Sequence, residues 1–155
     1  MVSRHLLCAS LAILCMNARL QGDEPDLQLD GKWVVASLTI NGTELPLSES
    51  PDSFWFDIDG KEWTYSFVVD GQRTTARFAV TLSESDSTAL IDAKLMNGAH
   101  AGGICKGICS IDGDVLQLCL AETPAAARPT QFECPENSEV QLFKLRRVQS
   151  SESSR

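Results

Sequence analysis

The side chains of this 155-residue chain best suited to metal binding or nucleophilic chemistry are those of two histidines and six cysteines. His100, Cys105 and Cys109 follow the spacing His-x4-Cys-x3-Cys, and Cys119 or Cys134 could supply a fourth ligand to zinc. Structural zinc motifs usually contain two cysteines with only two residues between them, and this chain has no such pair. Disulfides account for the same cysteines more simply if the chain is exported, so we predict no metal and no cofactor.

Nucleophilic catalysis would require a histidine beside a serine or cysteine nucleophile. His100 lies in the glycine-rich stretch 97–103, without a nucleophile-elbow motif around any serine. The carboxylates of Asp57 and Asp59 fall at a turn, where turn formation and solubility explain them. We therefore predict that the protein is not an enzyme.

The N-terminal segment predicts export. Arg4 precedes an uncharged apolar run of eleven residues, 6–16, which is too short to span a bilayer. We expect a signal peptide over residues 1–22, cleaved between residues 18 and 22, and a periplasmic, cell-envelope or secreted location. The alternatives are an uncleaved hydrophobic anchor and lipoprotein anchoring at Cys15, although Leu14 is not the small residue that such processing normally needs.

The charge of the chain argues against one class of partner. It carries 21 acidic and 13 basic residues, a formal net charge of -8, and its only adjacent basic pair is Arg146 and Arg147. Such a surface repels phosphate backbones. Binding to nucleic acid is therefore not expected.

Cleavage of the signal would remove Cys8 and Cys15 and leave four cysteines as disulfide candidates, namely Cys105, Cys109, Cys119 and Cys134. An even number in an oxidising compartment predicts two disulfides, with three possible connectivities. If Cys105 and Cys109 lie in one extended strand, they are about 13 Å apart, which is beyond disulfide reach. Each would then need Cys119 or Cys134 as its partner.

From residue 29 onward, short β-prone runs alternate with turns such as Asn41-Gly42, Asp59-Gly60 and Asp70-Gly71. The expected strands are residues 33–40, 43–47, 53–58, 61–69, 72–82, 90–95, 104–111, 115–121 and 140–148. Hairpin-linked strands leave exposed edges unless the sheet closes. We therefore predict an all-β domain over residues 29–148, a single antiparallel up-and-down barrel of eight or nine strands, with a two-sheet sandwich as the alternative. Residues 149–155 are expected to be a disordered tail.

Alternation along the expected strands identifies the inner face of the barrel. Trp63, Tyr65, Phe67 and Val69 share one face of the run 61–69, and Leu116, Leu118 and Leu120 share one face of the run 115–121. The candidate ligand-binding residues are Trp63, Tyr65, Phe67, Phe78, Leu118 and Phe143, joined by Trp55 or one of its neighbours. A barrel of eight strands either fills with such side chains or holds one small ligand, and both readings stay open.

The segment Leu29-Asp30-Gly31-Lys32-Trp33 carries a Gly-x-Trp, and Leu145-Arg146-Arg147 ends the last expected strand. Together these segments resemble lipocalins, whose tryptophan closes one end of the barrel beneath an arginine from the last strand. The resemblance implies that Trp33 and Arg147 close this barrel, with Arg146 as the alternative.

More specifically, the chain resembles a group of uncharacterised small lipocalin-like domains that are abundant in planctomycete bacteria. The stretches that carry this resemblance are Gly31-x-Trp33, Asn41-Gly42 followed by Leu45-Pro46, Ile111 to Cys119, Arg128-Pro129-Thr130-x-Phe132 and Leu145-Arg146-Arg147. The chain departs from the group at Cys105, Cys109 and Cys134, and has Ile108 and Cys109 where an aromatic residue is usual. Because the group has no established activity, the resemblance implies only a fold and an exported location.

Two functions follow as hypotheses. The first is a non-catalytic extracytoplasmic binding module for an unknown, small apolar molecule. The alternative is a protein–protein interaction or protease-inhibitor-like barrel with a filled core, whose contacts would come from residues 48–52 and 97–103. Neither hypothesis requires a stable membrane span.

Overall fold

A computed structural model describes residues 26–47, 53–85 and 88–149 of the chain. The expected signal peptide with Cys8 and Cys15, the stretch 48–52 and residues 150–155 of the expected tail lie outside these residues. Within them there are nine strands and no helix, so no described helix could cross a membrane.

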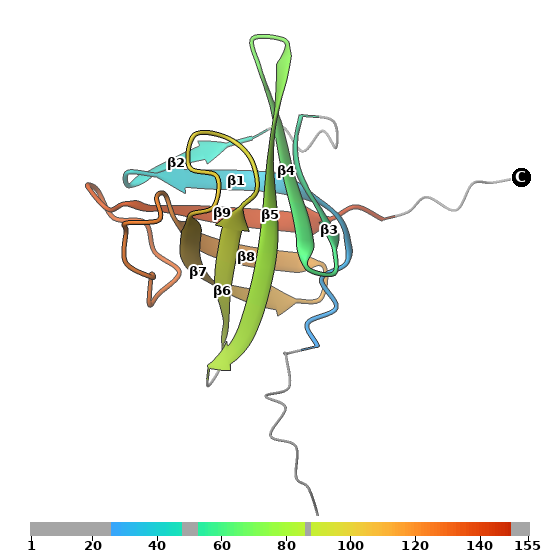
Figure 1. The fold of residues 1–155 in the computed structure, drawn as a ribbon. Coiled ribbons are helices and arrows are strands. Elements are labelled where there is room, and N and C mark those ends of the chain that lie inside the picture. Colours follow the sequence, from blue (N-terminus) through green and yellow to red (C-terminus); the bar gives the residue numbers. More distant parts are fainter. Residues whose placement is uncertain (1–25, 48–52, 86–87, 150–155) are drawn as a thin grey trace, which may run out of the picture.

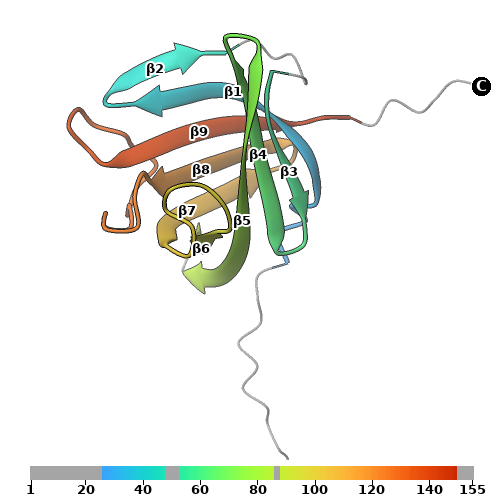
Figure 2. The ribbon, with the colours of Figure 1, turned by 45° about the horizontal axis from the view of Figure 1, so that its top comes forward.

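The strands are β1 (Gly31–Ile40), β2 (Thr43–Pro46), β3 (Phe54–Asp59), β4 (Glu62–Val69), β5 (Gln72–Ser85), β6 (Thr88–Leu95), β7 (Ile104–Asp112), β8 (Val115–Ala121) and β9 (Val140–Arg147). They form one antiparallel sheet in the order β2-β1-β3-β4-β5-β6-β7-β8-β9, which closes through a pairing of β1 with β9. Figures 1 and 2 show the strands wrapped around a common interior. The predicted barrel is thereby confirmed.

Strand β1 is the element that closes the sheet. One edge of β1 pairs with β9 from Trp33 to Ile40, with a register shift between Val35 and Ser37. The opposite edge is shared, because β3 pairs with residues 31–34 and β2 with residues 37–40. Eight strands therefore form the barrel, and β2 is a ninth strand that pairs with the C-terminal part of β1.

The barrel interior is packed with apolar side chains. The largest side chains with almost no exposed surface include Trp33, Ile91, Leu116, Leu118 and Leu145. They come from β1, β6, β8 and β9, which lie far apart in the sequence and meet only in the closed sheet. Burial of this apolar surface is the main stabilising contribution to such a fold.

Alternation assigned most inner faces correctly, with two differences near β3 and β4. Phe54, Phe56 and Ile58 are the inward residues of β3. Trp55 lies on the outer wall, where the Lys32 amine and the Arg73 guanidinium lie 4.6 Å and 4.3 Å from its ring centre. The suggestion of Trp55 itself as an interior residue is therefore wrong. Val69 is 53% exposed because the β4–β5 hairpin projects beyond the rest of the barrel, as Figure 1 shows.

The long connection between β8 and β9, residues 122–139, covers part of the outer wall. Ala126 and Cys134 of this connection are buried, as are the outward-facing Ile108 of β7 and Cys119 of β8. Arg128 attaches the connection to the sheet, because its guanidinium donates to the carbonyl oxygens of Ile91 and Gly107 at 2.8 and 2.7 Å. A second small apolar layer thus lies outside the barrel.

Candidate functional site

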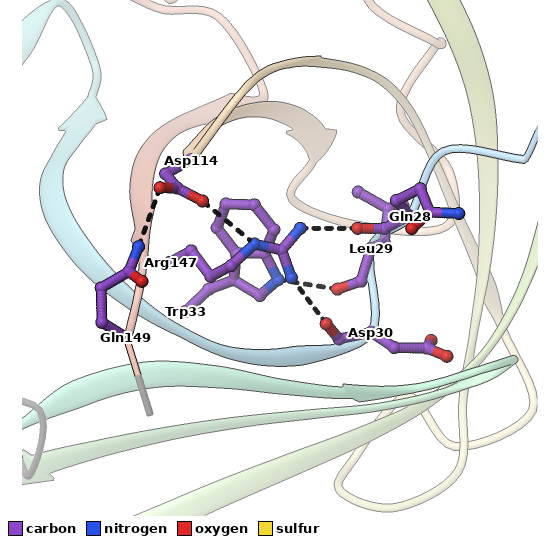
Figure 3. Close-up of polar contacts among 7 residues, drawn as sticks. All are labelled: Gln28, Leu29, Asp30, Trp33, Asp114, Arg147 and Gln149. Atoms are coloured by element: carbon purple, nitrogen blue, oxygen red, sulfur yellow. Dashed lines mark hydrogen bonds and ion pairs between the residues drawn. The ribbon is translucent and has the colours of Figure 1, made fainter. Parts of the chain in front are cut away.

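The chain crosses one end of the barrel at residues 26–30, next to the turns at Gly60 and Gly113, and we call this the closed end. Trp33 is fully buried there, and its indole nitrogen donates to the carbonyl oxygen of Leu29 at 2.7 Å. The Arg147 guanidinium lies over the indole, 4.2 Å from its centre. Figure 3 shows this arrangement, in which the Gly-x-Trp segment and the last strand meet as the resemblance implied.

Arg147 also binds the segment that crosses the barrel end. Its two terminal nitrogens donate to the carbonyl oxygens of Asp30 at 2.7 Å and Gln28 at 2.6 Å, and its Nε lies 3.4 Å from an Asp114 carboxylate oxygen. Gln149 donates to the other Asp114 oxygen at 2.8 Å (Figure 3). Arg147 therefore joins β9, the β7–β8 turn and residues 28–30, which is a structural role.

Gly31 has a backbone reason to be glycine. Its φ of +121° lies in a region that side chains disfavour, and a Cβ there would meet an Arg147 guanidinium nitrogen at 3.5 Å. The first residue of the Gly-x-Trp motif thus lets the chain enter β1 directly beside Arg147.

Beside this cluster lies a hollow of about 640 Å³. Its apolar lining comes from Leu27 and Leu29 of the crossing segment and from Val80 and Leu82 of β5. Its polar lining consists of Asp26, Gln28, Asp30, Gly60, Lys61, Gly113, Asp114 and Arg147. We refer to this site as the closed-end hollow. Its volume lies within the range of small-molecule sites.

The six predicted ligand-binding residues all project into the barrel, but they differ in burial. Trp63, Leu118 and Phe143 are buried in the core cluster, while Tyr65, Phe67 and Phe78 are half-buried. Tyr65 stacks on Phe56 at 4.7 Å between centroids, meets Phe143 edge-on at 5.7 Å and lies 5.3 Å from the Phe67 ring. Burial raises the pKa of the Tyr65 hydroxyl, so that group stays neutral. The predicted site is thus part of the packed core, and Tyr65, Phe67 and Phe143 belong to one aromatic cluster within it.

The four cysteines are free thiols divided between two faces of the sheet. Cys105 and Cys109 lie on β7 opposite Ala93 and Ala89 and share their inward face. Cys119 faces outward, beneath the connection that carries Cys134. The predicted pairing of Cys105 and Cys109 with Cys119 or Cys134 is therefore wrong, because the sheet separates the two sets. The spacing of Cys105 and Cys109 excluded a disulfide between them, but it did not show which face of the sheet each thiol would occupy.

The same division separates the residues of the hypothetical zinc site. His100 lies exposed in the β6–β7 connection, away from the inward thiols of β7 and the outward thiol of β8. Among the described residues, no three His, Cys, Asp or Glu side chains are grouped so that they could hold a metal ion.

Two parts of this geometry were not predicted from the sequence. Arg128 was noted only as part of a matching stretch, yet it contacts two carbonyl oxygens and lies 2.5 Å from a carboxylate oxygen of Asp92. Leu27, Lys61 and Leu82 were not recognised as neighbours, because they come from three distant segments. For Arg128, the only signal in the sequence was its position before Pro129, in a connection otherwise rich in small residues. For the three residues of the hollow there was none.

The strand order, the pairing of β1 with β9 and the Arg147–Trp33 contact define an antiparallel, lipocalin-like barrel. No family model and no curated protein matches the chain. Among solved structures, it is similar to a lipocalin-like protein from Bacteroides uniformis, with 15% identity and a TM-score of 0.47. The match covers 78% of this chain and 99% of the other.

Proposed function

We propose that this chain is an exported, non-catalytic binding module that takes a small, mainly apolar molecule in the closed-end hollow. The observation that carries the proposal is the hollow itself, whose volume of about 640 Å³ falls within the range of small-molecule sites. Four aliphatic side chains offer an apolar surface, and the surrounding polar groups can orient a ligand.

The charges around the hollow favour a neutral or cationic ligand. Three carboxylates, of Asp26, Asp30 and Asp114, line it together with two cations, of Lys61 and Arg147. Arg147 is already occupied by two carbonyl oxygens and by Asp114. The net charge of -8 on the chain further disfavours an anion.

The aromatic cluster remains the alternative location for the ligand. Tyr65, Phe67 and Phe78 are half-buried and face the interior, so a small molecule could extend their packing. Deeper entry would displace side chains such as Leu118, which has no exposed surface. Close-packed interiors resist such displacement, which is why we favour the hollow.

A second candidate function is the binding of a protein partner by a barrel with a filled core. The projecting β4–β5 hairpin favours it, because Val68 and Val69 near its tip are 39% and 53% exposed. The hypothesis predicts capture of a specific partner by immobilised wild-type protein. It further predicts that replacing both valines with serine abolishes the capture.

Export and membership of the planctomycete group remain predictions from the sequence motifs. Expression of the complete chain with its own N-terminal segment tests export directly. N-terminal sequencing of the mature protein should then give a start between residues 19 and 23, one residue after the predicted cleavage window. A product that keeps Met1 and stays in the cytoplasm would contradict the prediction.

Two measurements test the binding module. The first compares the native and the denatured intact mass of the exported protein, because a bound molecule adds mass that denaturation removes. The second titrates the protein with a neutral apolar dye, N-phenyl-1-naphthylamine, and follows its fluorescence. No added mass and no dye binding would refute the small-molecule function.

Matched variants separate the two locations. Leu27→Arg places a charge in the hollow without altering any strand, whereas Phe67→Arg places one in the aromatic cluster. We expect Leu27→Arg to weaken dye binding at least tenfold and Phe67→Arg to leave it nearly unchanged. The reverse pattern would move the site to the aromatic cluster.

A further inference from the structure

Cys119 and Cys134 occur together outside the barrel, although 14 residues separate them in the sequence. Cys119 lies on the outer face of β8 with no exposed surface, and Cys134 lies in the β8–β9 connection with 8% exposed. The connection that covers Cys119 is thus the same segment that carries Cys134.

The contacts of the two thiols place them over one short region of the sheet. The Cys119 thiol donates to the carbonyl oxygen of Glu133 at 3.6 Å, and Glu133 immediately precedes Cys134. Standard backbone dimensions then bring the Cys119 sulfur within about 6.5 Å of the Cys134 Cα. The Cys134 thiol donates to the carbonyl oxygen of Val140 at 3.1 Å. Val140 pairs with Ala121, two residues from Cys119 on the same strand.

The other two thiols cannot compete for these positions. Cys105 and Cys109 lie four positions apart on one extended strand, and they face the barrel interior. Distances of this kind exceed the reach of a disulfide, and the sheet stands between the inner and outer thiols. Among the four described cysteines, only Cys119 and Cys134 share a face and a neighbourhood.

We propose that Cys119 and Cys134 are a disulfide-forming site, and that Cys105 and Cys109 remain thiols. A low-molecular-weight disulfide such as oxidised glutathione is the oxidant. The more exposed Cys134, as its thiolate, attacks one glutathione sulfur and releases one glutathione. The Cys119 thiolate then attacks Cys134 in the mixed disulfide and releases the second. The two protein thiols lose two protons and two electrons, and the glutathione disulfide gains them.

The bond would fasten the β8–β9 connection to the outer wall of the barrel. At present Arg128 holds the middle of this connection, and the hydrogen bond of Glu122 to Glu139 joins its two ends at 2.9 Å. A disulfide across a loop of this length restricts the unfolded chain and stabilises the fold. Because burial raises the pKa of Cys119 to about 11, oxidation should accelerate with rising pH.

Peptide mapping of the wild-type chain tests the pairing. The folded, reduced protein is treated with oxidised glutathione, its remaining thiols are alkylated, and it is digested at lysine and at acidic residues. Lys106, Asp112 and Glu133 lie between successive cysteines, so each thiol falls on its own peptide. We expect a linked Cys119–Cys134 peptide, with Cys105 and Cys109 alkylated after denaturation. Links to any other cysteine, or full alkylation of Cys119 and Cys134, would overturn the proposal.

Stability supplies the second readout. Oxidation should raise the Tm of the wild-type protein by about 5–10 °C, judged from the loop length and the size of the domain. The increase should vanish in Cys134→Ala and persist in the matched control Cys105→Ala. An equal response of both variants would also overturn the assignment. Neither readout depends on the closed-end hollow.

Discussion

The guanidinium of Arg147 lies 4.2 Å from the centre of the Trp33 indole, and the backbones of the same two residues are paired partners of β9 and β1. One contact therefore joins the first and last strands through both side chain and main chain. Since this pairing is the one that closes the sheet, stability should depend on it more than on neighbouring surface contacts.

Arg147→Ala should lower the free energy of unfolding by about 1–3 kcal/mol, because it removes the cation–π contact and two charge-assisted hydrogen bonds. Arg147→Lys should recover only part of this loss, since an ammonium cannot reproduce the planar fork. Urea unfolding measures both. Arg146→Ala, at an exposed position one residue away, should cost less than Arg147→Ala. Equal effects of the two alanine variants would contradict the role of Arg147.

Trp33→Ala should cost about 3–5 kcal/mol, the usual loss for a large buried aromatic side chain. Trp33→Phe should cost less but still lose the hydrogen bond to Leu29. Trp55→Ala is the natural comparison, because Trp55 lies half-exposed on the outer wall. A Tm that falls as far for Trp55→Ala as for Trp33→Ala would refute this ranking.

Gly42 and Gly71 form a matched pair of turn glycines, with φ values of +74° and +76°. Gly71→Ala should cost about 1 kcal/mol, from its backbone conformation alone, because nothing lies within 4 Å of the added Cβ. Gly42→Ala should cost at least about 1 kcal/mol more, since its Cβ would meet Glu136 Cγ at 2.7 Å and Glu136 N at 3.1 Å. Thermal unfolding of both variants side by side checks the difference.

Arg128→Ala should loosen the β8–β9 connection without unfolding the barrel. The variant leaves the carbonyl oxygens of Ile91 and Gly107 without this donor and removes the partner of Asp92. Amide hydrogen exchange should therefore accelerate selectively in residues 122–139. Lys94→Ala, at an exposed position of the same strand as Asp92, serves as the control. Exchange that stays at the wild-type rate would show that Arg128 does not hold this segment.

Alkaline pH should destabilise the reduced protein through its buried thiols. Burial raises the pKa of Cys109 from 9.0 to about 12 and that of Cys119 from 9.0 to about 11. The unfolded chain loses these protons near pH 9 while the folded chain keeps them, so stability is complete below pH 9 and falls as pH rises toward 11 and 12. Each thiol contributes a slope of up to about 1.4 kcal/mol per pH unit.

Urea unfolding between pH 8 and pH 11, with a reductant present, measures this slope. Cys119→Ala should make it shallower by the share of one thiol while leaving the trend below pH 8 unchanged. A slope identical to that of the wild-type protein would contradict the assignment to Cys119.

Local patterns were sufficient for the strands and most of their faces. The alternation of Trp63, Tyr65 and Phe67 identified the inner face of β4, because successive strand residues point to opposite sides whatever the partner strand is. The Asn-Gly and Asp-Gly turns located the hairpins, since these residues adopt positive φ at little cost. Alternation did not show how far β4 and β5 extend beyond the barrel. Val69 was therefore predicted to face the core, although it is 53% exposed.

What only the tertiary structure decided are the relationships between distant segments. Arg147 bonds to Gln28 across 119 positions, and Arg128 bonds to Ile91 across 37. The hollow combines the crossing segment with β5 and two turns. The register of β8 against β7 pairs Cys109 with Leu118, so Cys119 lies on the opposite face of the sheet from Cys109. Periodicity constrains each strand separately, whereas closure of the sheet sets the register of every strand at once. The sequence by itself therefore determined the elements and their apolar faces, and closure decided which side chains meet.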